Sequence, residues 1–425
     1  MKSRALSCIL IAIFATASST AYCATNLNNS NASTVSLQTQ CGSTSDCAES
    51  MYDLLTWIWG TKHPSAVNPL LVNIGPGNFP VNDPSTGSGM QFCNNNGYVT
   101  FRGAGRGTTT ITGEGYSGIK AGFTSLGSVV LIKNCQQLSF EDLTISAPLD
   151  GDMNDNAIGW IGGGSSNWTN VEVVAAYYPW VDICASGSTV VGTHNWFSSS
   201  LVSNGSGILN TGYRSDCGIS EIYGSKIFST KTARGGLWSI LGVEAGAHGH
   251  VEIYGSSVKV LVPANADPSI VLPIMADPVT GAYGQGGLLA LDGGVIHMHG
   301  GVVSVRHEID GVNSSVFGAR TVGAGSSIHT PDTAYGMKAS GSGILARVMT
   351  DGGMVMAPFQ WPQGDTPPVI TSANGADSFV ETDCNASGVC DGVPTDQQMP
   401  HMMIYNANCV ANGPWFDETM NSCRQ

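Results

Sequence analysis

A short pattern that recurs along the chain constrains its fold more than any other feature. Residues 221–225 (EIYGS) return 31 residues later as residues 252–256 (EIYGS). Looser versions stand at residues 140–145 (FEDLTI), 168–173 (WTNVEV) and 296–301 (IHMHGG). Each copy joins two short apolar strands through a small polar turn, and such a unit cannot bury its apolar face alone. The repeats therefore predict a solenoid whose coils stack around one hydrophobic column.

The composition agrees with a β-rich solenoid. Gly makes up 55 of the 425 residues and charged residues only 11%, which indicates many tight turns rather than disorder. A propeller would demand stricter blade lengths, and a sandwich would not need the repeat. We therefore expect an all-β fold, a right-handed parallel β-helix. The uneven spacing predicts loop insertions, the clearest at residues 262–283.

The N-terminus is typical of an export signal, which we place at residues 1–23. Lys2 and Arg4 precede an apolar run at residues 8–17, and small residues at 19–21 offer a cleavage site. No later apolar run is long enough to span a bilayer. We expect a secreted protein, either extracellular, periplasmic or at the cell surface. Loss of the signal takes the formal net charge from -14 to about -16, which disfavours nucleic acid as a partner.

A helix is predicted between a flexible leader at residues 24–47 and the first coil. Asp46 and Glu49 resemble a capping box, and Gly60 and Pro64 should end the helix. One face of this helix is apolar, formed by Met51, Leu54, Leu55 and Ile58. A stack of coils has two open ends whose edges need cover. The helix suits the first end of a coil stack that we place at residues 48–348, and residues 349–425 suit the other as a cysteine-containing cap.

Cysteines are numerous enough to predict disulfides. Ten of the 12 cysteines lie beyond Cys23, and an even number in an exported chain favours disulfide bonds over free thiols. The close pairs Cys41/Cys47 and Cys384/Cys390 are natural local bridges. The connectivity of the others stays open, and no Cys/His spacing indicates zinc.

Three segments carry a resemblance to a known superfamily. Residues 72–79 (VNIGPGNF), 99–111 (VTFRGAGRGTTTI) and 138–145 (LSFEDLTI) resemble the opening turns of pectin-lyase-like β-helix proteins. The order of a capping helix followed by these strands is similar to that of pectin methylesterases. The resemblance implies a right-handed β-helix and a polysaccharide partner. An enzyme of this kind would be a carbohydrate esterase, lyase or hydrolase.

The catalytic segments of methylesterases have no clean match in this sequence. The nearest stretches are residues 178–183 (YPWVDI), 212–216 (GYRSD) and 232–236 (TARGG). They supply the candidate catalytic residues Asp182, Asp216, Arg214 and Arg234. Two carboxylates could act as acid and base on a glycan, with an arginine to stabilise negative charge, if the coils bring them to one face. The alternative is that both aspartates are turn residues that bind backbone amides.

Aromatic residues suggest where a sugar would bind. Tyr177, Tyr178 and Trp180 lie next to Pro179, and Trp238 follows the third stretch. Consecutive strand residues point to opposite faces, so we expect that these tyrosines and Trp180 are not all buried. They could line a glycan groove, although core packing also uses aromatic side chains.

Two acidic loops have oxygen ligands at alternate positions, the pattern that suits calcium. One contributes Asp150, Asp152 and Asp155, and the other Asp383, Asn385 and Asp391. Both lack the distal glutamate of an EF-hand loop. Calcium is the cation they would take, and no cofactor is required by the fold.

Two H-x-H pairs, His248/His250 and His297/His299, place imidazoles on one face of a strand, where each pair could chelate a metal. No run of acids or cysteines lies nearby in sequence, so we expect stacked polar side chains in adjacent coils instead.

The sequence thus predicts a protein that acts on or binds a polysaccharide. Because a fold does not dictate a function, a non-catalytic surface adhesin and a structural envelope protein stay open as alternatives.

Overall fold

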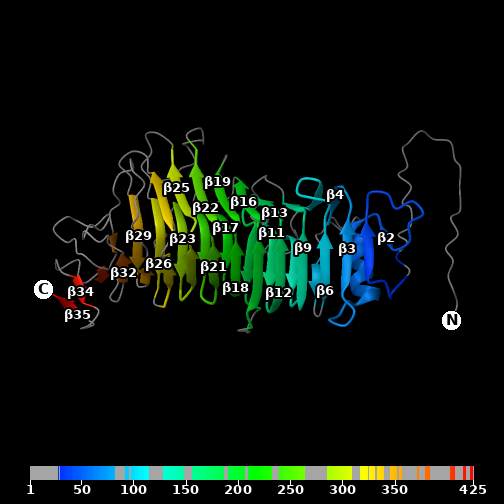
Figure 1. Ribbon diagram of the computed structural model, residues 1–425, viewed down its shortest axis with the longest axis horizontal. Helices are drawn as coiled ribbons and strands as arrows, with labels where there is room; N and C mark the ends of the chain where they lie inside the picture. Colours follow the sequence, from blue (N-terminus) through cyan, green and yellow to red (C-terminus); the bar gives the residue numbers. More distant parts are fainter. Residues whose placement is uncertain are drawn as a thin grey trace.

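The computed structural model describes residues 27, 29–81, 91–94, 97–113, 128–147, 156–185, 190–205, 209–231, 239–263, 285–308, 316–323, 325–330, 333–338, 345–351, 354–356, 371–372, 379–382, 403–406, 415–417 and 422–424. Figure 1 shows an elongated stack of coils, with the N-terminal strands at one end and the C-terminal strands at the other. The predicted signal segment and nearly all of the predicted insertion at 262–283 lie outside the described residues. Among the described residues, no helix is long and apolar enough to cross a membrane.

The coils contribute strands to three sheets, which we call sheets 1, 2 and 3 in the order in which the chain visits them from β5 to β30. Sheet 1 has ten strands: β5 (Gln91–Asn94), β8 (Ser128–Lys133), β11 (Asn156–Ile161), β14 (Trp180–Ile183), β17 (Leu209–Ser215), β20 (Ser239–Ala245), β23 (Gln285–Leu291), β26 (Val316–Val322), β29 (Leu345–Asp351) and β31 (Thr371–Ser372). Sheet 3 has nine: β4 (Gly77–Pro80), β7 (Thr109–Thr112), β10 (Thr144–Ser146), β13 (Glu172–Ala175), β16 (Ser200–Gly205), β19 (Lys226–Lys231), β22 (Ser257–Val262), β25 (Val302–His307) and β28 (Ala334–Lys338).

Sheet 2 runs the whole length of the stack. Its 16 strands, in spatial order, are β2 (Cys47–Ala48), β1 (Thr34–Leu37), β3 (Leu70–Ile74), β6 (Tyr98–Arg102), β9 (Gln137–Glu141), β12 (Gly164–Thr169), β15 (Gly192–Phe197), β18 (Gly218–Tyr223), β21 (His250–Tyr254), β24 (Val295–His299), β27 (Ser327–His329), β30 (Met354–Met356), β32 (Phe379–Thr382), β33 (Met403–Asn406), β34 (Trp415–Asp417) and β35 (Ser422–Arg424). Neighbours pair in parallel as far as β32, and the last strands pair antiparallel. The predicted right-handed parallel β-helix is confirmed.

The sequence repeats stack in register. Glu221 pairs with Glu252 and Tyr223 with Tyr254, so the two EIYGS copies occupy equivalent positions in adjacent coils. From β9 to β22, the chain turns from sheet 2 to sheet 3 through a single left-handed residue in each coil. That residue is Gly224 (φ 53°) and Gly255 (φ 54°) in these two coils. Glycine adopts this conformation without steric cost, which explains its place in the motif.

The interior is one column of stacked side chains. The Phe140 ring lies 4.5 Å from that of Trp168, which in turn lies 4.8 Å from Trp196. All three rings are buried, and each comes from the same position of a successive sheet 2 strand. Parallel in-register pairing places equivalent residues one above another, so one inward position per coil builds a continuous core.

The predicted helix is present as α1 (Met51–Trp57), and its predicted apolar face is buried. Its cap differs from the prediction, because Ser50 rather than Asp46 caps the first turn and accepts a hydrogen bond from the Asp53 amide. The helix also does not stop at Gly60. It widens into the π-helix η1 (Ile58–Lys62) and ends at His63, which is left-handed (φ 48°).

Three disulfides lie among the described residues. The predicted Cys41–Cys47 bridge is confirmed, while Cys384 and Cys390 lie outside the described residues. The other two bonds, Cys93–Cys135 and Cys184–Cys217, each join adjacent strands of sheet 1 or the residues that follow them. These two pairings could not be read from the sequence, since they depend on which coils are neighbours.

Candidate functional site

A charged cluster lies on the outer face of sheet 1, where β17 and β20 run side by side. We call Tyr178, Arg214, Asp216 and Glu244 the Arg214 cluster. Arg214 and Glu244 are register partners in adjacent coils, so their side chains leave the sheet at the same level. The flanking residues Tyr213 and Ser215 are buried, which leaves Arg214 as the outward residue of its strand. A cation and an acid are thus held together by strand pairing.

Arg214 contacts all three other members of the cluster. Its Nη2 lies 2.9 Å from Asp216 Oδ2, and its Nη1 lies 3.5 Å from Glu244 Oε1. Nη1 also donates a hydrogen bond of 3.2 Å to the Tyr178 hydroxyl, and the guanidinium lies 5.6 Å from the centre of that ring. Planar, multidentate binding of this kind suits arginine. The guanidinium therefore has a fixed orientation.

The two carboxyl groups of the cluster, those of Asp216 and Glu244, differ in their exposure to solvent. The side chains of Arg214 and Asp216 are 23% and 25% exposed, whereas that of Glu244 is 2% exposed. Burial raises the pKa of Glu244, and the neighbouring Arg214 opposes this rise. Asp216 is therefore the carboxylate within reach of a bound molecule, and Glu244 lies beneath the arginine. Because a guanidinium sits between the carboxyls, the cluster disfavours a metal cation.

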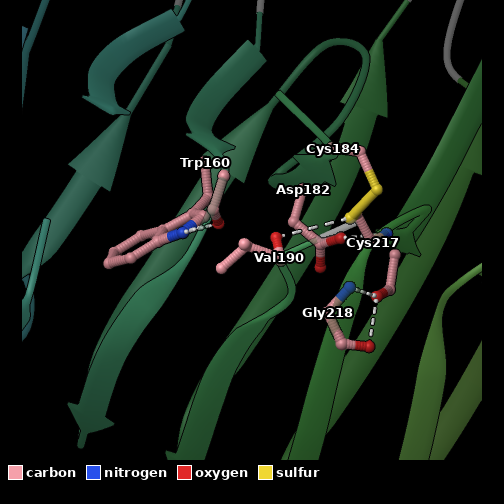
Figure 2. The surroundings of a disulfide bond; sticks show 8 residues. Trp160, Asp182, Cys184, Val190, Cys217 and Gly218 are labelled. Carbon is pink, nitrogen blue, oxygen red and sulfur yellow. Dashed lines mark hydrogen bonds between the residues drawn. A yellow bond between two sulfur atoms is a disulfide. The ribbon is translucent and has the colours of Figure 1, made fainter. Parts of the chain in front are cut away.

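Asp182 does not join this cluster, which corrects the expectation that Asp182 and Asp216 share a face. Its side chain is buried inside the coil, beside the Cys184–Cys217 disulfide (Figure 2). The Cys217 amide donates to Oδ1 at 2.8 Å, and Trp180 Nε1 donates to Oδ2 at 3.2 Å. Burial raises its pKa to about 7. The carboxyl is out of reach of a polymer on the surface.

A histidine lies near Asp182 in the interior. His194 Nδ1 is 2.9 Å from Ser166 Oγ, which accepts a 2.7 Å hydrogen bond from Trp168 Nε1. Burial lowers the pKa of His194 to about 3. The Gly218 backbone packs against both the Asp182 carboxyl and the His194 ring. Serine, histidine and aspartate thus occur together, but inside the core, where they serve packing.

The predicted aromatic groove is wrong for its described members, because Tyr177, Tyr178 and Trp180 are all buried. Trp180 packs in the core, 5.6 Å from Trp168. Both tyrosines lie between β13 and β14, outside any strand, so strand alternation does not apply to them, and their rings pack against each other at 4.6 Å. Burial raises the pKa of Tyr178, whose hydroxyl is oriented toward Arg214.

Several predicted site residues lie outside the described residues. They are Arg234 and Trp238, and the calcium-loop residues Asp150, Asp152, Asp155, Asp383, Asn385 and Asp391.

Glu244 is the member of the cluster that the sequence analysis missed. It stands in an otherwise apolar strand, Ser239–Ala245, where a lone acid is unusual. It also follows Arg214 by 30 residues, close to the 31-residue spacing of the EIYGS copies in the same two coils. A spacing of 31 residues from Arg214 leads to Ala245, one residue past Glu244, so the repeat alone does not identify the pair.

Comparisons with known proteins add similarities of shape. No protein-family model matches the chain, and no curated protein matches its sequence. The structure of pectin methylesterase PemA from Erwinia chrysanthemi is similar over 65% of this chain and 79% of that one, with 12% identity and a TM-score of 0.37. A pectin methylesterase in complex with a hexasaccharide is similar over 68% of this chain and 89% of that one, with 14% identity and a TM-score of 0.36. The parallel β-helix rests on the strand pairing described above and not on these similarities.

Proposed function

We propose that the protein hydrolyses ester groups on a polysaccharide at the outer face of sheet 1, with Asp216 and Arg214 as the catalytic residues. The observation that carries this proposal is the Arg214 cluster itself. It presents one accessible carboxylate and one oriented guanidinium side by side on the face of a long parallel sheet. Such a face can accept an extended polymer across several coils.

The number of accessible carboxylates favours an ester over a glycosidic bond. Glycoside hydrolysis commonly uses two carboxyl groups on either side of the scissile bond. Within the cluster only Asp216 is accessible, since Glu244 is buried beneath Arg214. Ester hydrolysis needs one base or nucleophile and a group that stabilises the oxyanion. Asp216 and Arg214 meet that smaller requirement.

The reaction would proceed by attack on the ester carbonyl carbon. Asp216 would take a proton from water, whose oxygen forms the new bond, and the alcohol would leave with that proton. Arg214 would stabilise negative charge on the carbonyl oxygen. Glu244 is a positioning residue, because it contacts Arg214 and is too buried to touch the substrate.

We also infer that the protein works outside the cytoplasm. Three disulfides among the described residues are typical of chains that fold in an oxidising compartment. The basic residues and the apolar run within residues 1–23 also support export from the cytoplasm.

The test is release of methanol or acetate from a panel of methyl-esterified and acetylated polysaccharides. The wild-type chain should release one of them, Asp216→Asn should abolish release, and Arg214→Lys should reduce it strongly. Glu141→Gln is the matched control, because it alters an Arg102–Glu141 ion pair on sheet 2. Full activity of Asp216→Asn would exclude the mechanism. A folded wild-type chain that releases nothing but binds a polysaccharide would identify the non-catalytic alternative.

A further inference from the structure

We infer that His250, Glu252 and His297 form a binding site for a divalent transition-metal ion, for which zinc fits best, with His299 beside it. The site lies on the outer face of sheet 2, on β21 and β24, and is separate from the Arg214 cluster on sheet 1. The inference does not depend on the proposed esterase activity.

Strand pairing brings these side chains together from distant parts of the sequence. Glu252 pairs with His297 across the two strands, and His250 lies two residues before Glu252 on the same face of β21. His250 Nε2 lies 2.6 Å from Glu252 Oε1, and His297 Nδ1 lies 2.8 Å from the same oxygen. His299 Nε2 lies 3.2 Å from Oε2. Three imidazoles thus converge on one carboxylate.

The expectation that polar side chains stack in adjacent coils is confirmed, since Glu252 pairs with His297 and Tyr254 with His299. Stacking holds for His299, whose ring lies 4.9 Å from Tyr254 and nearly parallel to it. The rings of His250 and His297 lie edge to face at 77° rather than parallel. The acid is Glu252, two residues after His250 on β21, and strand pairing brings it to His297 of the neighbouring coil.

The distances suit a small metal ion. One ligand atom each from His250, Glu252 and His297 lie within 4.8 Å of one another. Zinc bonds of about 2.0–2.1 Å with tetrahedral angles place ligand atoms about 3.4 Å apart. A modest opening of the two hydrogen bonds would therefore admit the ion in place of their protons. Two imidazoles and a carboxylate are ligands that zinc and copper accept, whereas calcium prefers oxygen alone.

Ordinary surface hydrogen bonding is the competing explanation, and the preceding coil shows what it looks like. Glu221 occupies the same register position as Glu252, and its carboxylate accepts a 2.7 Å hydrogen bond from the Tyr223 hydroxyl. No histidine pairs with Glu221 in β15 or β21. At Glu252, three imidazoles surround a partly exposed carboxylate. A metal ion there would link two coils whose ligands are 45 residues apart in sequence.

The bound metal ion would act as a crosslink between the neighbouring coils that contain β21 and β24. β22 ends at Val262 and β23 begins at Gln285, so 22 residues of chain separate the two strands. A bond that closes a long segment removes freedom from the unfolded chain. We therefore expect the metal to stabilise the stack, and the partly exposed ligands to leave one coordination position for water.

The experiment is isothermal titration calorimetry of Zn²⁺ into the full chain purified without a polyhistidine tag. One Zn²⁺ ion should bind this site, and His250→Ala, His297→Ala and Glu252→Gln should each weaken its binding by more than about tenfold, since even outer-shell partners of metal ligands are worth 10- to 100-fold. His248→Ala and Glu221→Gln are the matched controls and should bind as the wild type does. Zn²⁺ should also raise the melting temperature of the wild type, and millimolar Ca²⁺ should not compete.

Two outcomes would overturn the inference. One is that the wild-type chain binds Zn²⁺ no more tightly than the His250→Ala/His297→Ala double variant does. The other is Zn²⁺ binding that all three single variants retain at full strength, since the ion would then lie elsewhere. Circular dichroism without zinc shows whether a variant is folded. If an alanine variant is not folded, the isosteric Glu252→Gln variant decides the test, because weaker Zn²⁺ binding by this variant supports the site and unchanged binding overturns it.

Discussion

Replacing the buried Asp182 by asparagine should make the protein's stability respond differently to pH. The pKa of this carboxyl rises from 3.8 in a free chain to about 7 in the fold because the side chain is buried. The folded state therefore binds the proton more tightly than the unfolded chain does. The stability contributed by protonation is fully present below pH about 4 and is lost as the pH rises through about 7. This contribution to the free energy of unfolding amounts to about 4 kcal/mol.

The measurement must be a difference between two chains, because His194 titrates in the opposite sense. Burial lowers its pKa from 6.5 to about 3, so its contribution is present above pH 6.5 and is lost as the pH falls. The two effects partly cancel in the wild type between pH 4 and 6.5. Asp182→Asn removes only the carboxyl. Its stability relative to wild type should rise by about 4 kcal/mol between pH 4 and pH 8.

Urea unfolding followed by tryptophan fluorescence, at pH values from 4 to 8, gives this difference. The comparison holds where the two chains have equal m-values. Asp292→Asn, which removes an exposed turn carboxyl, controls for the loss of one negative charge. A change of less than about 1 kcal/mol across this range would refute the raised pKa, since one pH unit of such a titration is already worth more. A difference that falls with pH would mean that the fold holds Asp182 ionised.

Three further predictions concern the coil stack. Trp168→Ala should lower the unfolding free energy by about 3–5 kcal/mol, measured by urea unfolding, because the ring is buried between Phe140 and Trp196; a loss under about 1 kcal/mol would contradict the continuous column. Removing Cys184–Cys217, which closes 33 residues, should cost about 4 kcal/mol, and removing Cys41–Cys47, which closes 6, about 2 kcal/mol; the reverse order in thermal unfolding would show that loop length does not dominate. Gly164→Ala should destabilise more than Gly224→Ala, since an added Cβ would overlap the Cys135 carbonyl at Gly164 and meets open space at Gly224; equal melting temperatures would speak against this packing.

The fold could be predicted from the sequence because its information is repeated. A parallel stack places the same position of successive coils one above another, so each coil states the pattern again. The aligned copies at Glu221 and Glu252, and the equivalent Phe140 and Trp168, are therefore readable without a structure. The disulfide Cys184–Cys217 was not readable, because several pairings of the same cysteines fit the same repeats.

The site could be predicted only in part, and the reason lies in side-chain direction. Arg214 and Asp216 come from one local stretch of sequence, and their closeness along the chain is enough to predict their contact. Asp182 also comes from a local stretch, but whether a strand residue faces the core or the solvent depends on the phase of the inward–outward alternation along its strand. That phase follows Trp180, whose large ring enters the core and takes Asp182 inward with it two residues later. Glu244 and Glu252 show the converse. Glu244 contacts Arg214 of the neighbouring coil, and Glu252 contacts His297 of the neighbouring coil. Neither role could therefore be assigned before the register between the coils was known. In this solenoid, therefore, contacts along the chain supply part of each site, and contacts across coils complete it.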